Sequence, residues 1–429
     1  MSALNPNQVP PERPPWWRAL GPALITACVV FGPGSLLISS NVGANHGYEL
    51  LWMLVLTALL MGTYMTMSAR VGVVGGATPC TLLADRVGRW FAALIGINLC
   101  LVCGAFQFSN NVALATALGA FVPEGWALAG LVAVNASIIL FLFFAAHIYK
   151  ILERVMKVMV GVILVSFAFN LFAARPDPVG VIEGLLPGLP EGVTIGVPRL
   201  VGGAVEDPMI LVASLLGTTF SVAGAFFQGN LVREKGWDIR DYRRGIGDSI
   251  AGVIVLTGVS AIIMITAATV IRGLPADNIG TLARSLEPLL GPLSYTLFCV
   301  GLVAVSLNPF LINAMIGGTM LADGIGKPAK LSDRWPRIFT VGVLLVGLMV
   351  ALLALGGGRN PIQLIIFGQA LTVIGNPLMA GTLLWLANRR DIMGERRNSR
   401  IVNVLGGLGL LVIVLMAVRV LWRIVLQLG

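Results

Sequence analysis

The sequence predicts an all-α integral membrane protein with eleven transmembrane helices, and its composition and patterning support this. Hydrophobic residues make up 57% of the 429 residues, charged residues make up only 11%, and the mean hydropathy is +0.89. A soluble domain carries about a quarter charged residues, so this composition excludes that class. Apolar runs of about 20 residues, the length that crosses a hydrocarbon core, recur along the whole chain.

Eleven such runs are bounded by charges or by glycine and proline. We expect one single membrane domain over residues 20–429, preceded by a polar tail over residues 1–19. The predicted spans begin near Leu20, Tyr48, Trp90, Ala127, Val155, Met209, Ser249, Leu289, Ile338, Ile362 and Ile401.

The basic residues predict the orientation of the chain in the membrane. Of the 29 lysines and arginines, 22 fall on the side of the N-terminus and 7 on the other. Because positive residues are retained inside, we predict an inner-membrane protein with a cytoplasmic N-terminus and an external C-terminus. The net charge of +9 then reflects topology, so no nucleic-acid partner is expected. The expected partners are the lipid bilayer and a small solute, with no obligate protein partner.

Two predicted spans contain helix-breaking residues near their middle. The first carries Gly32, Pro33 and Gly34, and the sixth carries the triplet at 223–225, Ala-Gly-Ala. Proline removes a backbone donor and glycine disfavours a helix interior by about 1 kcal/mol. Interruptions at the start of both halves are typical of transporters built from inverted repeats, with the substrate site between the breaks. We therefore predict repeats over 20–173 and 209–388, followed by an extra helix over 401–425.

Several segments, in order along the chain, resemble the Nramp family of proton-coupled divalent-metal transporters, which have the LeuT-type fold. The family patterns DPGN and GAQYGY followed by LLW are similar to GPGS at 32–35 and GANHGYELLW at 43–52. YKILERVMKVMV at 149–160, GQALTVIGNPLMAG at 368–381 and DIMGERRN at 391–398 also resemble family segments. The resemblance implies a secondary transporter, not an enzyme, in which helices one and six are interrupted.

The departures from the family pattern fall at its metal site. In the family, an Asp and an Asn of helix one and a Met of helix six bind the metal, and a neighbouring His belongs to the proton route. In this sequence the Asp position is Gly32, the Asn position is Ser35, and MPHN is replaced by SVAG at 221–224. The acidic residue of helix three is missing from QFSNN at 107–111, whereas Gln369 matches a residue that approaches the ion in the family. We therefore expect weak manganese binding.

The remaining candidate site is neutral, and the sequence leaves its solute open. Family membership favours a divalent cation, and hydrated magnesium would suit oxygen ligands. The positive N-terminal ends of half-helices instead favour a small organic anion, or a neutral or zwitterionic solute. We expect no cofactor, no standard metal ligand and no identifiable proton route. The predicted substrate-binding residues are Gly32, Gly34, Ser35, Ser221, Ala223, Gly224, Gln369 and Asn376.

The ionisable residues near the spans all lie at predicted helix ends. For His46 and His147 we expect interfacial or structural roles. A channel would need a continuous polar stripe and an enzyme a catalytic constellation, and neither pattern is present. The carboxylates at predicted ends are Glu49, Asp85, Glu153, Asp248 and Asp323.

Overall fold

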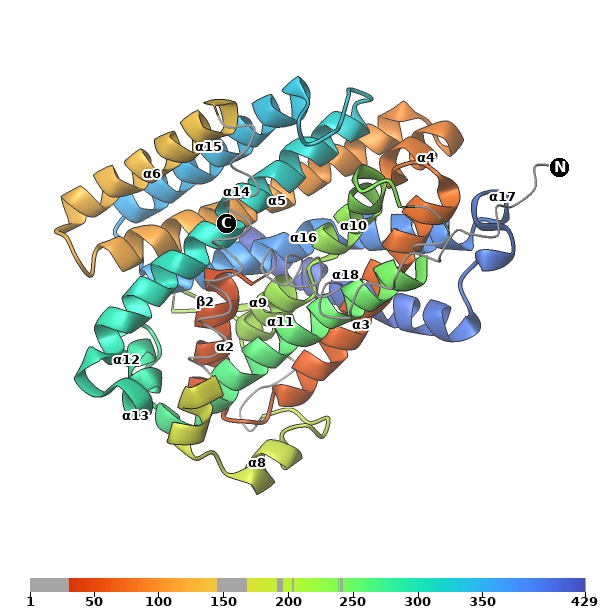
Figure 1. Ribbon diagram of the computed structural model, residues 1–429. Helices are drawn as coiled ribbons and strands as arrows, with labels where there is room; N and C mark the ends of the chain where they lie inside the picture. The colour runs from red at the N-terminus through yellow and green to blue at the C-terminus, as the bar shows by residue number, and fades with distance from the viewer. Residues whose placement is uncertain are drawn as a thin grey trace, which may run out of the picture.

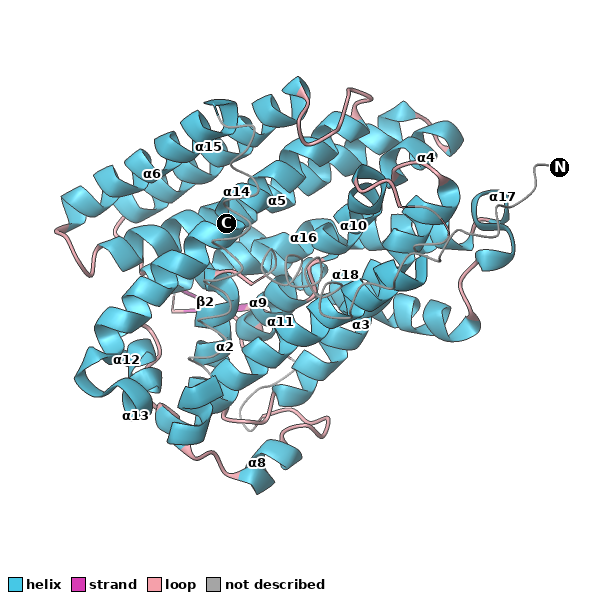
Figure 2. Cartoon of the chain, in the orientation of Figure 1, coloured by secondary structure: helices cyan, strands magenta, loops and turns pink. Residues whose placement is uncertain are grey.

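The computed structural model describes residues 31–144, 168–190, 196–202, 204–237, 239 and 242–428. Figure 2 shows that this part of the chain is a bundle of helices with one small hairpin. Strands β1 (Arg199–Val201) and β2 (Ala204–Glu206) pair antiparallel, with Arg199 opposite Glu206. The predicted all-α membrane class is confirmed.

Eight helical segments of the described residues are long and apolar enough to cross a membrane. The broken helix formed by α9 (Ile210–Thr219) and α10 (Val222–Glu234) is one of them. The helices that correspond to the other predicted spans are α2 (Pro33–His46), α3 (Leu51–Gly75), α5 (Arg89–Leu118), α6 (Glu124–Phe144), α11 (Tyr242–Val270), α14 (Ser294–Gly324), α15 (Arg334–Gly356), α16 (Pro361–Asn388) and α18 (Arg400–Leu428).

Most predicted starts agree with these helices to within four residues. Helix α11 begins seven residues before Ser249, because its polar first turns continue the helix. Helix α14 begins five residues after Leu289, because Gly291 and Pro292 form a 3-10 turn just before it. The first half of span one and most of span five lie outside the described residues, so the total of eleven remains a prediction.

Short helices connect the long ones and mark two opposite ends of the bundle (Figure 1). We call these the α4 end and the α8 end; the charge distribution predicts that the α4 end is cytoplasmic. The α4 end carries α4 (Pro79–Arg86) and α17 (Arg390–Met393), followed by η3 (Gly394–Arg396). The α8 end carries α8 (Pro178–Glu183), α12 (Ile279–Ala283), η1 (Arg284–Leu286), α13 (Glu287–Leu290) and η2 (Gly291–Leu293).

The break in the sixth helix lies earlier than the sequence suggested. Phe220 (φ −101°, ψ 62°) and Ser221 (φ −76°, ψ 89°) leave the helical conformation, whereas Ala223, Gly224 and Ala225 lie in the first turns of α10. Placing the break at 223–225 was therefore wrong. Ser221 makes the new start possible, because its Oγ accepts a hydrogen bond from the Gly224 N–H at 3.3 Å.

Helices α5 and α14 pack against each other along glycines. A Cβ atom on Gly96 would lie 2.6 Å from the Met320 carbonyl oxygen, and one on Gly324 would lie 2.6 Å from the Ala92 carbonyl oxygen. Small residues let membrane helices approach at backbone distance, where van der Waals contact drives association. These two helices therefore form a closely packed pair within the bundle.

Candidate functional site

The first turn of α2 is the centre of the candidate site. Gly32 is extended (φ −118°, ψ −179°), and Pro33 starts the helix, as its fixed φ favours. Pro33 has no N–H, and the Leu36 N–H donates to the Gly32 carbonyl at 3.3 Å. Among the described residues, the N–H groups of Gly34 and Ser35 are therefore the donors of this turn that lack an acceptor. The predicted interruption at Gly32 and Pro33 is confirmed for the side of the break that the structure describes.

Gln369 of α16 lies directly against this turn. A Cβ atom on Gly34 would lie 2.5 Å from both the Cδ and Nε2 atoms of Gln369, so only glycine leaves room for the amide. A Cβ atom on Gly217 of α9 would collide with the Gln369 carbonyl oxygen. Both glycines therefore let α16 approach the two broken helices, and the predicted pair Gly34 and Gln369 is brought together.

Buried polar atoms without a protein partner gather at this place. Ser35 is 1% exposed, and its hydroxyl has no hydrogen-bond partner among the described residues; the same is true of the Gln369 Oε1 atom. The hydroxyls of Ser39 and Ser40, about one turn further along α2, are equally buried and without such a partner. A buried polar group left unsatisfied costs about 1 to 3 kcal/mol, so a cluster of them indicates a bound solute or water.

Asn110 of α5 completes the cluster from a third helix. A Cβ atom on Gly32 would lie 3.7 Å from the Asn110 Oδ1 atom and 3.2 Å from Pro309 of α14. The Asn110 amide nitrogen is buried without a partner among the described residues. Hydroxyl and amide groups from α2, α5 and α16 thus converge on one turn of backbone.

Two neighbouring polar residues of α5, Ser109 and Asn111, bond to other helices instead. Asn111 accepts a hydrogen bond from Asn135 of α6 at 2.8 Å, and Ser109 donates to the Ile365 carbonyl of α16 at 3.3 Å. Gln107 lies against Gly347 of α15, where an added Cβ would be 2.6 Å from the Gln107 Cγ atom, and its buried amide atoms have no partner among the described residues. Within one polar segment, the sequence alone does not distinguish the residue that faces the site.

Other predicted site residues lie at some distance along their helices or are already engaged. Ser221 caps α10, and Ala223 is buried in the same turn at 3% exposure. Asn376 is buried on α16, but seven residues beyond Gln369, which corresponds to about 10 Å of helix. Gly224 is partly exposed at the start of α10. The structure therefore joins Gly32, Gly34, Ser35 and Gln369 most directly.

The chemistry of this cluster is neutral throughout. No group of three or more His, Cys, Asp or Glu side chains that could hold a metal occurs in the described part of the chain. His46 lies at the last residue of α2, as expected for an interfacial role, and His147 lies outside the described residues. Sulfur, imidazole and carboxylate side chains, which commonly bind transition metals, are not supplied by Gly32, Gly34, Ser35 or Gln369.

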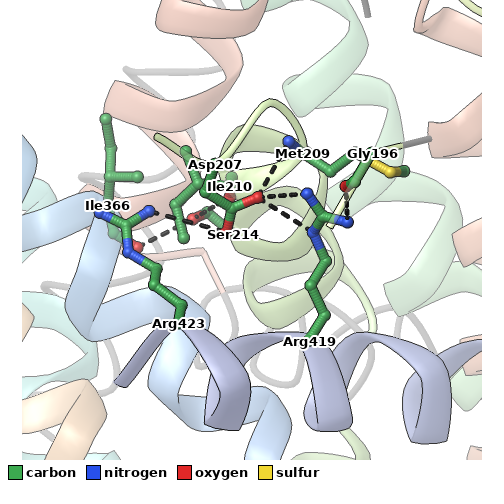
Figure 3. Close-up of polar contacts among 8 residues, drawn as sticks. All are labelled: Gly196, Asp207, Met209, Ile210, Ser214, Ile366, Arg419 and Arg423. Atoms are coloured by element: carbon green, nitrogen blue, oxygen red, sulfur yellow. Dashed lines mark hydrogen bonds and ion pairs between the residues drawn. The ribbon is translucent and has the colours of Figure 1, made fainter. Parts of the chain in front are cut away.

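A buried acidic group that the sequence did not single out lies before α9. Figure 3 shows Asp207 between Arg419 and Arg423 of α18. The Asp207 side chain is fully buried, and its Oδ1 atom accepts from Arg419 Nε at 3.0 Å and from the Met209 N–H at 3.1 Å. Arg423 Nη1 lies 3.7 Å from Asp207 Oδ2. Two arginines four residues apart in an apolar span were the available signal for a buried acidic partner.

A second buried carboxylate, Asp323, ends α14 at the α4 end. It was expected at a helix end, which is correct, but it is only 5% exposed. Its partners come from other helices: Asn230 of α10 donates to it at 2.8 Å, and Thr78 at the start of α4 donates at 2.9 Å. A charged residue at a predicted helix end is therefore not always at the surface.

Comparison with known proteins identifies relatives over nearly the whole chain. The family model described as natural resistance-associated macrophage protein-like (Nramp) matches residues 23–423. A divalent metal cation transporter MntH from Deinococcus radiodurans is 26% identical over 418 residues, covering 94% of this chain and 89% of the relative. MntH from Bacillus subtilis is 24% identical over 406 residues, covering 91% and 88%.

Solved structures agree on the fold. A manganese transporter from Eremococcus coleocola superposes with a TM-score of 0.75 at 19% identity, covering 100% of this chain and 97% of that one. Mhp1, a transporter of the nucleobase-cation-symport-1 family, superposes with a TM-score of 0.54 at 13% identity, covering 96% and 90%. At these identities the similarity establishes the arrangement of helices, including the predicted inverted-repeat architecture with interrupted helices one and six.

Proposed function

This chain belongs to the Nramp family, and on that premise we propose that it is a secondary transporter that carries a hydrated divalent cation by alternating access. The observation that carries this proposal is the cluster of neutral, buried side chains at the start of α2, where Ser35 and Gln369 have polar atoms without partners. Hydroxyl and amide oxygens accept hydrogen bonds from water as readily as they bind a hard ion directly.

Magnesium fits these groups better than manganese does. Mg²⁺ prefers oxygen ligands, gives up its waters reluctantly and is usually held with several of them in place. A site of hydroxyls and amides would bind the outer surface of such a hydrated ion. Relatives named as divalent metal cation transporters support the charge of the solute, whereas the lack of any group of three or more His, Cys, Asp or Glu side chains among the described residues argues against a dehydrated transition metal.

One observation favours a second candidate, a small organic anion or zwitterion. The Gly34 and Ser35 N–H groups have no acceptor among the described residues, and they and the partial positive charge of the α2 N-terminus face a cluster that contains no described carboxylate. The carbonyl groups that end α9, just before Phe220, carry the opposite partial charge and favour a cation. The two half-helix ends favour solutes of opposite charge, and family membership supports the cation.

The variant Gly32→Asp separates the two candidates. The nearest atom to an added Cβ is the Pro309 Cγ at 3.2 Å, so a small adjustment makes room for the side chain. One unit charge at about 4 Å and an effective dielectric of about 20 contributes about 4 kcal/mol, and more for a divalent ion. We expect magnesium binding to tighten by at least about a hundredfold. Isothermal titration of wild type and variant with magnesium, manganese and small carboxylates measures this; we expect the wild type to bind magnesium but no carboxylate, and the variant to bind magnesium more tightly.

If wild-type protein bound a carboxylate but not magnesium, and Gly32→Asp abolished that binding, the cation proposal would be wrong. Uptake into proteoliposomes then provides a second, steric test with a matched pair. Gly34→Ala pushes a methyl group into Gln369 and should lower uptake by at least about tenfold, whereas Gly104→Ala on α5, where an added Cβ meets nothing within 4 Å, should leave uptake unchanged. Equal activity of the two variants would remove Gly34 and Gln369 from the site.

A further inference from the structure

Asp323 collects hydrogen bonds from two other segments at the α4 end. Its Oδ2 atom accepts from the Asn230 amide of α10 at 2.8 Å, and its Oδ1 atom accepts from the Thr78 hydroxyl at 2.9 Å. The Thr81 hydroxyl lies 3.4 Å from the same oxygen. We call Asp323, Asn230, Thr78 and Thr81 the Asp323 cluster. One carboxylate thus joins α14, the second half of helix six and α4.

The donors in this cluster are neutral. Arg89 of α5 donates at 3.2 Å to the backbone carbonyl of Asp323, and Cys80 is buried beside the cluster on α4. Hydrogen bonds to an ionised acceptor are stronger than those between neutral groups, but each is much easier to release than a buried ion pair. The cluster is therefore a strong but separable attachment.

Helix α10 is held on a second face by α3 and α4. The Gly229 N–H donates to Ser68 Oγ at 3.0 Å, and Ser68 Oγ donates to the Phe226 carbonyl at 2.9 Å. A Cβ atom on Gly229 would lie 2.5 Å from the Pro79 Cγ atom. The half of helix six that follows the break is therefore packed tightly at the α4 end, and movement of this half must first separate it from α4 and Asp323.

We propose that Asp323 is a positioning residue for transport, a latch that holds α10 against α14 and α4 and releases it when this end of the bundle opens. This inference rests on the alternating access of the proposed function but not on the identity of the solute. A carboxylate suits the role because its two oxygens accept from donors on separate elements at once. An amide in its place would keep only one accepting atom.

Hydrogen–deuterium exchange of the full chain in nanodiscs, without substrate, tests the latch, because exchange reports local opening. Asp323→Asn removes the charge and leaves one accepting oxygen for the Asn230 and Thr78 donors, so it should raise exchange about tenfold in peptides 79–86 and 222–234, with no change in peptide 279–283 at the opposite end. Asn230→Ala, which removes one bond, should give a smaller rise of about threefold in the same two peptides. A loss of overall stability would instead raise exchange in all three.

The swapped double variant, which combines Asn230→Asp with Asp323→Asn, provides the decisive control. It restores an amide facing a carboxylate with the positions reversed, so exchange should return to within about twofold of wild type, whereas Asn230→Asp alone places two carboxylates together and should give the largest opening. Unchanged hydrogen–deuterium exchange in Asp323→Asn, or no recovery of slow exchange in the swapped double variant, would overturn the proposal. If Asp323→Asn did not fold, Asn230→Ala and Asn230→Asp would carry the same test.

Failure here and failure of the proposed function are distinguishable. Exchange is measured without any cation, so absence of magnesium binding would leave the latch intact. If the exchange test contradicted the latch, the magnesium binding expected for Gly32→Asp would be unaffected. Proteoliposome uptake by the swapped double variant adds a functional readout. We expect uptake and slow hydrogen–deuterium exchange to recover together, since a merely structural role would not require the pair to be complementary.

Discussion

Two buried carboxylates in the described part of the chain lie at opposite ends of the bundle and are satisfied in different ways. Asp207, before α9, is set between two arginines of α18, and the Asp207 and Arg419 side chains are 0% and 8% exposed. Asp323, at the end of α14, accepts from neutral amide and hydroxyl groups of α10 and α4. Both carboxylates belong to segments that pack on the broken sixth helix.

The difference separates a permanent attachment from a releasable one. Separating a buried ion pair leaves two uncompensated charges in a region of low dielectric, which is far more costly than separating a carboxylate from a neutral amide. We infer that α18, which the sequence predicts to lie outside the two repeats, is fixed to the start of α9, whereas the bonds that hold α10 to Asp323 can be released. The two halves of one broken helix are thus attached with different strengths.

The largest expected effect is that of Asp207→Asn. It leaves Arg419 and Arg423 buried side by side without an acidic partner, so we expect the free energy of unfolding to fall by about 3 to 5 kcal/mol. Asp323→Asn should lower it by only about 1 to 3 kcal/mol, because no charge is left unpaired. Thermal unfolding in detergent compares the two; an equal loss of stability would remove the distinction between the ends.

The two arginines should differ from each other by less. Arg419 makes direct hydrogen bonds to Asp207 and to the Gly196 carbonyl, whereas Arg423 is 3.7 Å from the carboxylate and 16% exposed. We expect Arg419→Gln to cost about 2 kcal/mol or more and Arg423→Gln less than about 1 kcal/mol, since the second variant leaves a balanced pair. The same unfolding measurement tests this order, and a reversed order would mean that Arg423 is the principal partner.

The smallest effect concerns an exposed carboxylate, Asp391 of α17, which pairs with Arg86 of α4 at 2.6 Å. Arg389 and Arg86 lower the pKa of Asp391 to about 2, from an ordinary value of 3.8. Because the pKa is lowered, the stabilisation is complete above pH 4 and is lost as the pH falls toward 2. The difference in melting temperature between wild type and Asp391→Asn should therefore be constant from pH 8 to pH 5; a change within that range would contradict the assignment.

The sequence predicts the fold well because lipid imposes a strong and simple constraint. Spans beginning near Trp90, Met209, Ile362 and Ile401 agree with the helices to within one residue, since their apolar runs end sharply at charged or polar residues. The predicted break of helix six is displaced because the prediction rests on glycine and alanine at 223–225, which are helical in the structure. The actual break at Phe220 and Ser221 depends on a serine cap, which composition does not reveal.

The site was predicted in part, and the reason lies in side-chain direction. Gly34 and Gln369 were expected together and are found together, because glycine at a broken helix permits close approach of another helix. Asn110 and Asn111 are neighbours in sequence, yet one faces α2 and the other bonds to Asn135. Asp323 was set aside as a residue at a helix end, since burial by α4 and α10 arises only from tertiary packing.

The glycine contact between α5 and α14 has a mechanical consequence. At Gly96 and Gly324 the two backbones are in direct contact, with no side chains between them, so we expect the helices to move together. We therefore expect α5 and α14 to act as one rigid unit between the two ends of the bundle. Asp323 lies at the α4 end of this rigid pair and bonds to α10. Separation of α10 from Asp323 would therefore have to act against both packed helices rather than against one flexible turn.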